Sequence, residues 1–143
     1  MTNWIRFIFI SILLAFIGSN IYAQSDSTTF KTEIYNKEYD IFIHLDLNNR
    51  QLIAPGHELF GPIAGYLRKS TSSFYWLILD AEICEKKATL QMVNDFGSED
   101  LVATLIQLND STYRLTQKKG SAIKVPYKGK WMKIPNTLEF KKR

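Results

Sequence analysis

The stretch Tyr39–Leu47 reads Tyr-Asp-Ile-Phe-Ile-His-Leu-Asp-Leu, with a large apolar or aromatic side chain at every odd-numbered position. This is the period of a β-strand, whose successive side chains point to opposite faces of a sheet. We therefore expect one face of this strand to pack against a core. The opposite face carries Phe42, His44 and Asp46, and we expect it to meet mostly water. The pair Asn48-Asn49 follows, and because asparagine tolerates positive φ the chain can reverse there.

Working outward, the rest of the chain repeats short runs of β-branched and aromatic residues separated by turn-forming residues. Such regular spacing indicates an all-β domain. The run 74–79 is apolar at every position, which is typical of a strand covered on both faces. We expect 126–135 to be irregular because a proline stands at each end. Further strands are expected at 63–67, 74–83, 88–93, 101–108, 112–117, 122–125 and 138–140.

These runs predict about eight or nine antiparallel strands joined by tight connections. Sequential hairpins favour an up-and-down meander, which closes into a barrel because closure removes exposed edges. The architecture resembles that of lipocalin-like ligand carriers, which place a Gly-x-Trp on their first strand. Here Gly129-Lys130-Trp131 has these letters near the other end of the chain, so the resemblance concerns architecture alone.

The N-terminus has the layout of a cleavable secretion signal. A head with one positive charge, Met1–Arg6, precedes the apolar run Phe7–Ile17 and a polar exit. Signal peptidase prefers small or slim residues one and three positions before the cut, and Ala23 with Ile21 meets this, so cleavage after Ala23 is expected. It leaves residues 24–143 as a single β domain that begins at Gln24. We expect a secreted or periplasmic protein with no stable membrane anchor after cleavage. The alternative is an uncleaved anchor, since the apolar window is marginal for a membrane span.

Cys84 is the only cysteine of the chain, so no disulfide can form within it. Stability must then come from packing. We expect Cys84 to be buried as a small apolar side chain, and an exposed thiol is the alternative.

Charge is distributed unevenly along the sequence. Residues 24–113 hold 7 basic and 13 acidic residues, and residues 114–143 hold 10 basic residues and one acidic residue, Glu139. In a closed sheet, strands from both parts lie side by side, so we expect the charges to interleave over the exterior. A basic face for an anionic partner is the alternative.

Acid-base and metal chemistry has few candidates, because the chain contains two histidines. His44 is expected to share a strand face with Asp40 and Asp46, a set that could hold a cation or tune the ring as a base. One strand rarely supplies enough ligands, so we expect a plain exposed face. His57 follows a Pro-Gly turn and is expected at the surface of a loop.

The connection 94–100 contains three acidic residues, Asp95, Glu99 and Asp100. They could bind calcium through oxygens, but their spacing differs from the helix-loop-helix calcium motif, and a solvated hairpin loop is expected. No nucleophile elbow or phosphate-binding glycine loop occurs in the sequence. We therefore expect no enzyme, metal or cofactor.

Two binding hypotheses remain. In the first, the barrel holds a small apolar ligand inside, and plain core packing is the alternative use of the same side chains. The ligand would contact Tyr66, Trp76, Met92 and Tyr113.

In the second hypothesis, surface loops at 94–100 and 128–135 bind an envelope or extracellular protein, as an interaction or inhibitor module does. The residues expected to make these contacts are Phe96, Glu99, Asp100, Lys130 and Trp131. Lysines beside Trp131 also resemble nucleic-acid surfaces. An exported protein rarely meets nucleic acid, so no such partner is expected.

Overall fold

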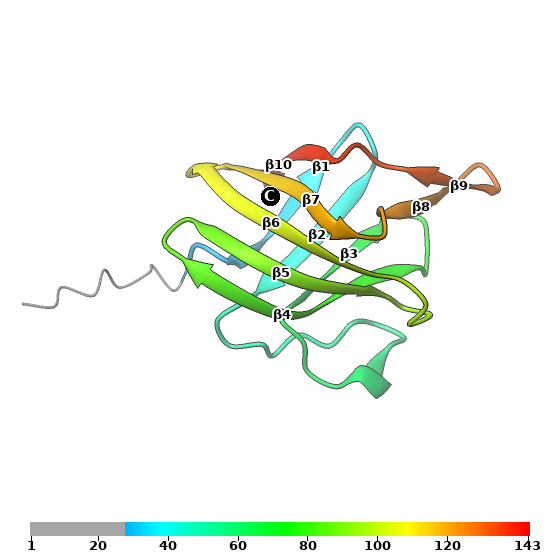
Figure 1. Ribbon diagram of the computed structural model, residues 1–143, viewed down its shortest axis with the longest axis horizontal. Coiled ribbons are helices and arrows are strands. Elements are labelled where there is room, and N and C mark those ends of the chain that lie inside the picture. The colour runs from blue at the N-terminus through cyan, green and yellow to red at the C-terminus, as the bar shows by residue number, and fades with distance from the viewer. Residues whose placement is uncertain (1–27) are drawn as a thin grey trace, which may run out of the picture.

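The computed structural model describes residues 28–143, and the predicted signal segment with its cleavage site lies outside the described residues. Eight antiparallel strands form a closed barrel, and two further strands form a separate hairpin (Figure 1). In the described part of the chain, no helix has the length and apolar character needed to cross a membrane. The barrel strands are β1 (Lys31–Asn36), β2 (Ile41–Asp46), β3 (Gly65–Lys69), β4 (Tyr75–Cys84), β5 (Lys87–Asn94), β6 (Asp100–Asn109), β7 (Thr112–Gly120) and β10 (Thr137–Lys142).

The strand order around the barrel is β1-β10-β7-β6-β5-β4-β3-β2. Six of the eight junctions join barrel strands that follow one another along the chain, and β7 is followed directly by β10 once the hairpin is set aside. The last strand, β10, pairs with β1 and closes the sheet. The prediction of an all-β antiparallel meander closed as a barrel is therefore confirmed.

Side chains fill the barrel interior. Along β5, every second residue from Ala88 through Leu90 and Met92 is buried, which is the alternation of a strand with one inward face. The largest fully buried side chains include Trp76 and Tyr113. An eight-stranded barrel is just wide enough for its own side chains to pack it, so this core is what the strand number leads us to expect.

The outer face of β2 is covered, and the prediction that it meets mostly water is wrong. Phe42 is 7% exposed, and its ring stacks on Tyr35 with 4.4 Å between ring centroids. The Arg68 and Arg143 guanidinium groups lie over the same ring, at 4.8 and 5.2 Å from its centroid. Neighbouring long side chains thus shield a position that alternation alone assigns to solvent.

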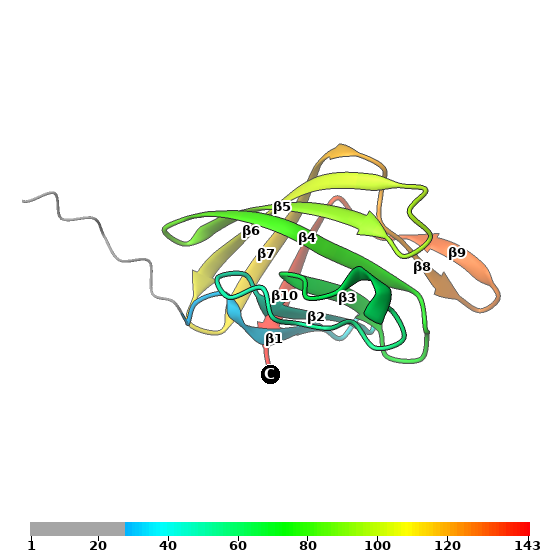
Figure 2. The ribbon, with the colours of Figure 1, turned by 90° about the horizontal axis from the view of Figure 1, so that it is seen from below.

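The long connection between β2 and β3 makes a second, smaller core outside the barrel. It contains the short 3₁₀ helix η2 (Glu58–Phe60) and folds back on itself through a bridge between Leu52 and Ile63. Figure 2 shows this segment against the outside of the sheet. The buried members of this outer core are Ala54, Ile63, Tyr66, Tyr75 and Leu77.

Strands β8 (Lys124–Tyr127) and β9 (Lys130–Lys133) form a hairpin that projects from one end of the barrel (Figures 1 and 2). Its turn residues Lys128 and Gly129 both have positive φ, 48° and 75°, as a two-residue type I′ turn requires. The prediction of an irregular segment at 126–135 is wrong in this part. Pro126 is tolerated because β8 pairs with a strand on one side only.

Cys84 is exposed, which corrects the prediction of a buried thiol. It is the last residue of β4 and pairs with Lys87 across the turn to β5. This position lies at the end of a strand, beyond the part of β4 that packs into the core, so its side chain reaches solvent.

Candidate functional site

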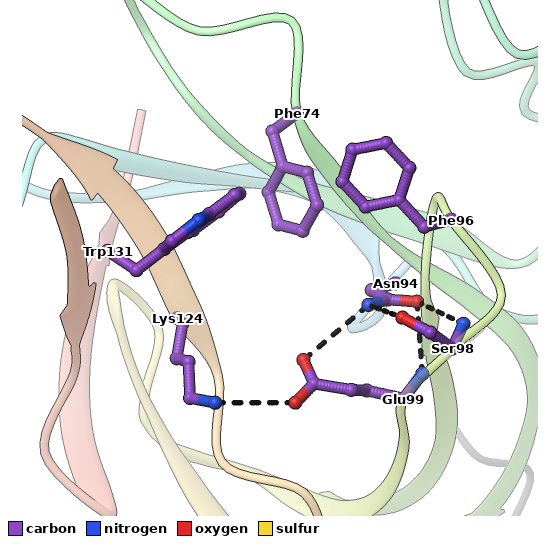
Figure 3. Close-up of a pocket in the computed structure, with 7 residues that line it drawn as sticks. All are labelled: Phe74, Asn94, Phe96, Ser98, Glu99, Lys124 and Trp131. Carbon is purple, nitrogen blue, oxygen red and sulfur yellow. Dashed lines mark hydrogen bonds and ion pairs between the residues drawn. The ribbon is translucent and has the colours of Figure 1, made fainter. Parts of the chain in front are cut away.

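Three aromatic rings from separate segments meet at the end of the barrel that carries the hairpin (Figure 3). Phe74 directly precedes β4, Phe96 lies in the β5–β6 connection, and Trp131 lies on β9. The Phe74 ring centroid is 5.5 Å from that of Phe96 and 4.7 Å from that of Trp131. Phe96 is 74% exposed and Trp131 is 55% exposed. Clustered exposed apolar side chains of this kind typically mark a binding surface.

The rings form the apolar wall of a pocket of about 250 Å³ that is open to solvent. Its polar wall consists of Asn94, Ser98, Glu99 and Lys124, and Lys124 Nζ lies 3.3 Å from Glu99 Oε1. Pockets for drug-sized ligands typically occupy about 300 to 1,000 Å³. This pocket is slightly smaller and suits one large side chain or a single ring. We call it the aromatic pocket.

Asn94 fixes the loop that carries Phe96. Its side chain is buried, and its Oδ1 accepts hydrogen bonds from the backbone N–H groups of Ser98 at 2.9 Å and Glu99 at 3.2 Å. Its Nδ2 donates to Ser98 Oγ at 3.0 Å. Gly97, with φ of 70°, supplies the left-handed residue of this turn. Phe96 is therefore held on a preformed loop, which lowers the entropy lost when a partner binds.

Asp95 ties the same loop to the rest of the molecule. Its Oδ2 accepts hydrogen bonds from the backbone N–H of Tyr75 at 3.1 Å and from His57 Nε2 at 2.8 Å. The other His57 ring nitrogen, Nδ1, lies 3.0 Å from the carbonyl oxygen of Pro55. Both His57 ring nitrogens thus lie within hydrogen-bonding distance of oxygen atoms. The side chain of His57 is 16% exposed, which corrects the prediction of a surface histidine.

His44 pairs with Glu33 rather than with the aspartates predicted to flank it. His44 Nδ1 lies 3.0 Å from Glu33 Oε2. Asp40 belongs to the β1–β2 turn, where its carboxylate accepts hydrogen bonds from Tyr35 and Ser70. Asp46 lies two residues from His44 on β2 and shares its face, but Asp40 does not, so the predicted set of three is not formed. Within residues 28–143, no three side chains of His, Cys, Asp or Glu gather closely enough to hold a metal ion.

Burial lowers the pKa of His44, and this effect outweighs the opposite effect of the Glu33 carboxylate. The ring stacks on Tyr66, with 4.6 Å between centroids. Neither His44 nor His57 lines the aromatic pocket. Both rings contact the outer core, His44 through Tyr66 and His57 through Tyr75 at 4.7 Å between centroids.

Of the four residues predicted to contact an interior ligand, three lie in the main core: Trp76, Met92 and Tyr113. Tyr66 belongs to the outer core instead. Its register partner on β4 is Leu77, whereas Leu67 pairs with Trp76, so Tyr66 and Trp76 point to opposite faces. The placement of Tyr66 beside Trp76 inside the barrel is thus corrected.

The structure brings three of the predicted loop residues, Phe96, Glu99 and Trp131, into the aromatic pocket. Asp100 and Lys130 are exposed outside it. Sequence reasoning included Asn94 only as the first residue of the loop 94–100, without a role of its own, and assigned neither Phe74 nor Lys124 to that surface. Nothing in the sequence distinguishes Phe74 from the apolar run that follows it, and Asn94 and Lys124 gain their roles only from loop and hairpin geometry.

Comparison with protein families, curated proteins and solved structures finds no significant match to this chain. The function is therefore inferred from the geometry of the site.

Proposed function

We propose that this chain is an exported, non-enzymatic binding protein that holds a partner protein through the aromatic pocket. The observation that carries the proposal is the meeting of two exposed aromatic side chains, Phe96 and Trp131, on the ring of Phe74. Phe96 comes from the β5–β6 connection and Trp131 from the β8–β9 hairpin, and both side chains remain largely exposed. A side chain of the partner would enter between them.

Physical chemistry supports a protein partner. Aromatic anchors that bury a large area dominate the energetics of protein interfaces, and a few such residues carry most of the binding free energy. Removing about 100 Å² of apolar surface from water stabilises a complex by roughly 2.5 kcal/mol. The hydrogen bonds of Asn94 and Asp95 hold the Phe96 loop in place before binding, so little of this free energy is lost to ordering the loop.

A small apolar ligand inside the barrel is the less favoured alternative. It would have to displace fully buried side chains such as Trp76, Tyr113 and Phe140, and each displaced ring loses its own packing. An enzymatic role is less favoured again, because neither histidine–carboxylate pair lines the aromatic pocket.

Site-specific photo-crosslinking tests the proposal. A photoreactive phenylalanine analogue at position 96 or 131, in the presence of an envelope or extracellular extract, is expected to capture one protein. Phe74→Ala should abolish this capture. Once the captured protein has been purified, Trp131→Ala should weaken its affinity for this chain about tenfold or more. The matched control places the analogue at Leu108, an exposed apolar residue at the opposite end of β6. Equal capture from position 108, or none from position 96 or 131, contradicts the proposal.

Export is tested separately from binding. Protein recovered from the periplasm or the medium is expected to begin at Gln24 when its N-terminus is sequenced, because the signal is cut after Ala23. Recovery of the chain in the membrane fraction with Met1 retained contradicts export by cleavage and favours the uncleaved anchor.

A further inference from the structure

A second depression lies beside the aromatic pocket, at the base of the hairpin. It measures about 300 Å³, and three lysine side chains line it, Lys118 and Lys119 from the end of β7 and Lys133 from β9. The other lining residues include Gln117 and Asn136, and none is acidic. We call it the lysine depression.

The aromatic pocket and the lysine depression are both lined by residues of the β8–β9 hairpin. Lys124 lines the aromatic pocket, and its partner across the ladder, Lys133, lines the lysine depression. Side chains of directly paired residues lie on the same face of a sheet, with Cβ atoms about 5 Å apart. Trp131 and Lys133 also share a face, two residues and about 7 Å apart along β9. The aromatic pocket and the lysine depression are therefore neighbouring parts of one surface.

Few acidic residues neutralise the lysines around the hairpin. Residues 117–136 contain six lysines and no aspartate or glutamate. Among residues 28–143, only Lys124 of these six forms an ion pair, with Glu99. Elsewhere the charges do interleave, since Arg114 pairs with Glu139 and Arg143 with Glu33. The predicted interleaving is thus weaker at the hairpin and its flanks, and an excess of positive charge of this kind attracts an anionic partner.

We infer that the partner binds through an acidic segment, with an apolar side chain in the aromatic pocket and one or more carboxylates over the lysine depression. This inference rests on the proposed function and names the chemistry of the partner. An extended chain advances about 3.3 Å per residue. A carboxylate two or three residues from the apolar anchor therefore reaches Lys133 when the anchor lies against Trp131.

The pocket itself favours such a segment over a polyanion. Glu99 lines the aromatic pocket, so a nucleic acid or a phospholipid surface would place negative charge next to this carboxylate as well as next to the lysines. An acidic peptide with an apolar residue at the anchor position places its charge over the lysines alone. Complementarity of this kind raises the association rate and selects among partners.

Panning a random dodecapeptide phage library on the purified protein tests the inference. Enriched peptides are expected to share a large apolar residue followed, within two or three positions, by aspartate or glutamate. The best synthetic peptide should bind about tenfold more weakly to the variant Lys118→Ser, Lys119→Ser, Lys133→Ser, since each exposed ion pair contributes up to about fivefold. Raising the salt concentration to 0.5 M should weaken binding to the unmodified protein similarly.

The control variant Lys31→Ser, Lys86→Ser, Lys87→Ser removes the same charge from exposed positions outside this surface and should bind as the unmodified protein does. Peptides that need Trp131 but carry neutral or basic flanks overturn the inference and leave the proposed function standing. Enrichment that does not depend on Trp131, tested with Trp131→Ser, overturns both. Tighter binding to phosphatidylserine vesicles or to an oligodeoxythymidine strand than to the peptides overturns the inference in favour of a polyanion.

Discussion

The indole Nε1 of Trp76 donates a hydrogen bond of 3.2 Å to the backbone carbonyl oxygen of Lys124. Trp76 is fully buried in the barrel interior, and Lys124 is the first residue of β8. The bond therefore connects the core of the barrel to the hairpin that carries Trp131. The sequence predicts Trp76 as a ligand contact, but in the structure it supports the hairpin that forms one wall of the aromatic pocket.

Trp76→Phe should loosen the hairpin. The variant loses this hydrogen bond and part of the packed volume, so we expect the free energy of unfolding to fall by about 2 kcal/mol. Amide hydrogen exchange in 124–133 should become faster. The matched control is Tyr113→Phe, which removes the 2.6 Å bond from Tyr113 Oη to the Thr29 carbonyl oxygen elsewhere in the core. Unchanged exchange in the hairpin of Trp76→Phe, or equal acceleration in both variants, contradicts the role given to Trp76.

Alternation along 39–47 predicted one strand, because the period of a strand depends on backbone geometry alone. The regular spacing of similar runs along the rest of the chain then predicted the fold class. The face of the sheet on which each side chain lies was harder to predict. Tyr66 was assigned to the interior, but its register with Leu77 turns it outward, and a shift of one residue in register moves a side chain to the opposite face. Register depends on pairing between strands, which a single sequence does not display.

The candidate site could be predicted only in part. Phe96 and Trp131 were predicted as binding residues because each is a large aromatic side chain in a polar or irregular connection. Their meeting on Phe74 depends on closure of the barrel, which brings the β5–β6 connection and the hairpin to one end. The lysine depression was missed for a similar reason, since Lys118 and Lys133 become neighbours only when the hairpin folds back beside β7.

His57→Ala should weaken the attachment of the β2–β3 connection to the barrel. The variant loses the 2.8 Å contact between Nε2 and Asp95 Oδ2. A hydrogen bond to a charged group contributes about 1.5 to 3 kcal/mol, so we expect urea denaturation to show a loss of about 2 kcal/mol. Exchange of the Leu52 and Ile63 amides, which bond each other's carbonyl oxygens, should become faster. Leu59→Ser, at a fully exposed neighbour, should change stability by less than about 0.5 kcal/mol, and an equal loss there would refute the explanation.

Gly65→Ala should strain the pairing of β2 with β3. A Cβ atom at this position would lie 2.5 Å from the backbone carbonyl oxygen of His44. Backbone cannot yield as a flexible side chain does, so we expect a loss of about 1 to 3 kcal/mol in the free energy of unfolding. Gly56→Ala is the comparison, because nothing lies within 4 Å of its Cβ position and only its φ of 77° opposes the change. We expect a smaller loss there, of about 1 kcal/mol, and thermal unfolding that ranks the two in reverse order contradicts the steric argument.

His44 should make the protein less stable as the pH falls from 7.5 to 5.5. Burial lowers the pKa of His44 below its ordinary value of 6.5, and the nearby Arg68 and Arg143 act in the same direction. Its Nε2 is buried without a hydrogen-bond partner among the described residues, so a proton added there finds no acceptor. The unfolded chain then binds more protons than the folded one near pH 6, and stability decreases toward acid. His44→Phe should keep the stacking on Tyr66 and reduce this dependence. Urea midpoints at the two pH values check this, and an equal decrease in both proteins shows that another group is responsible.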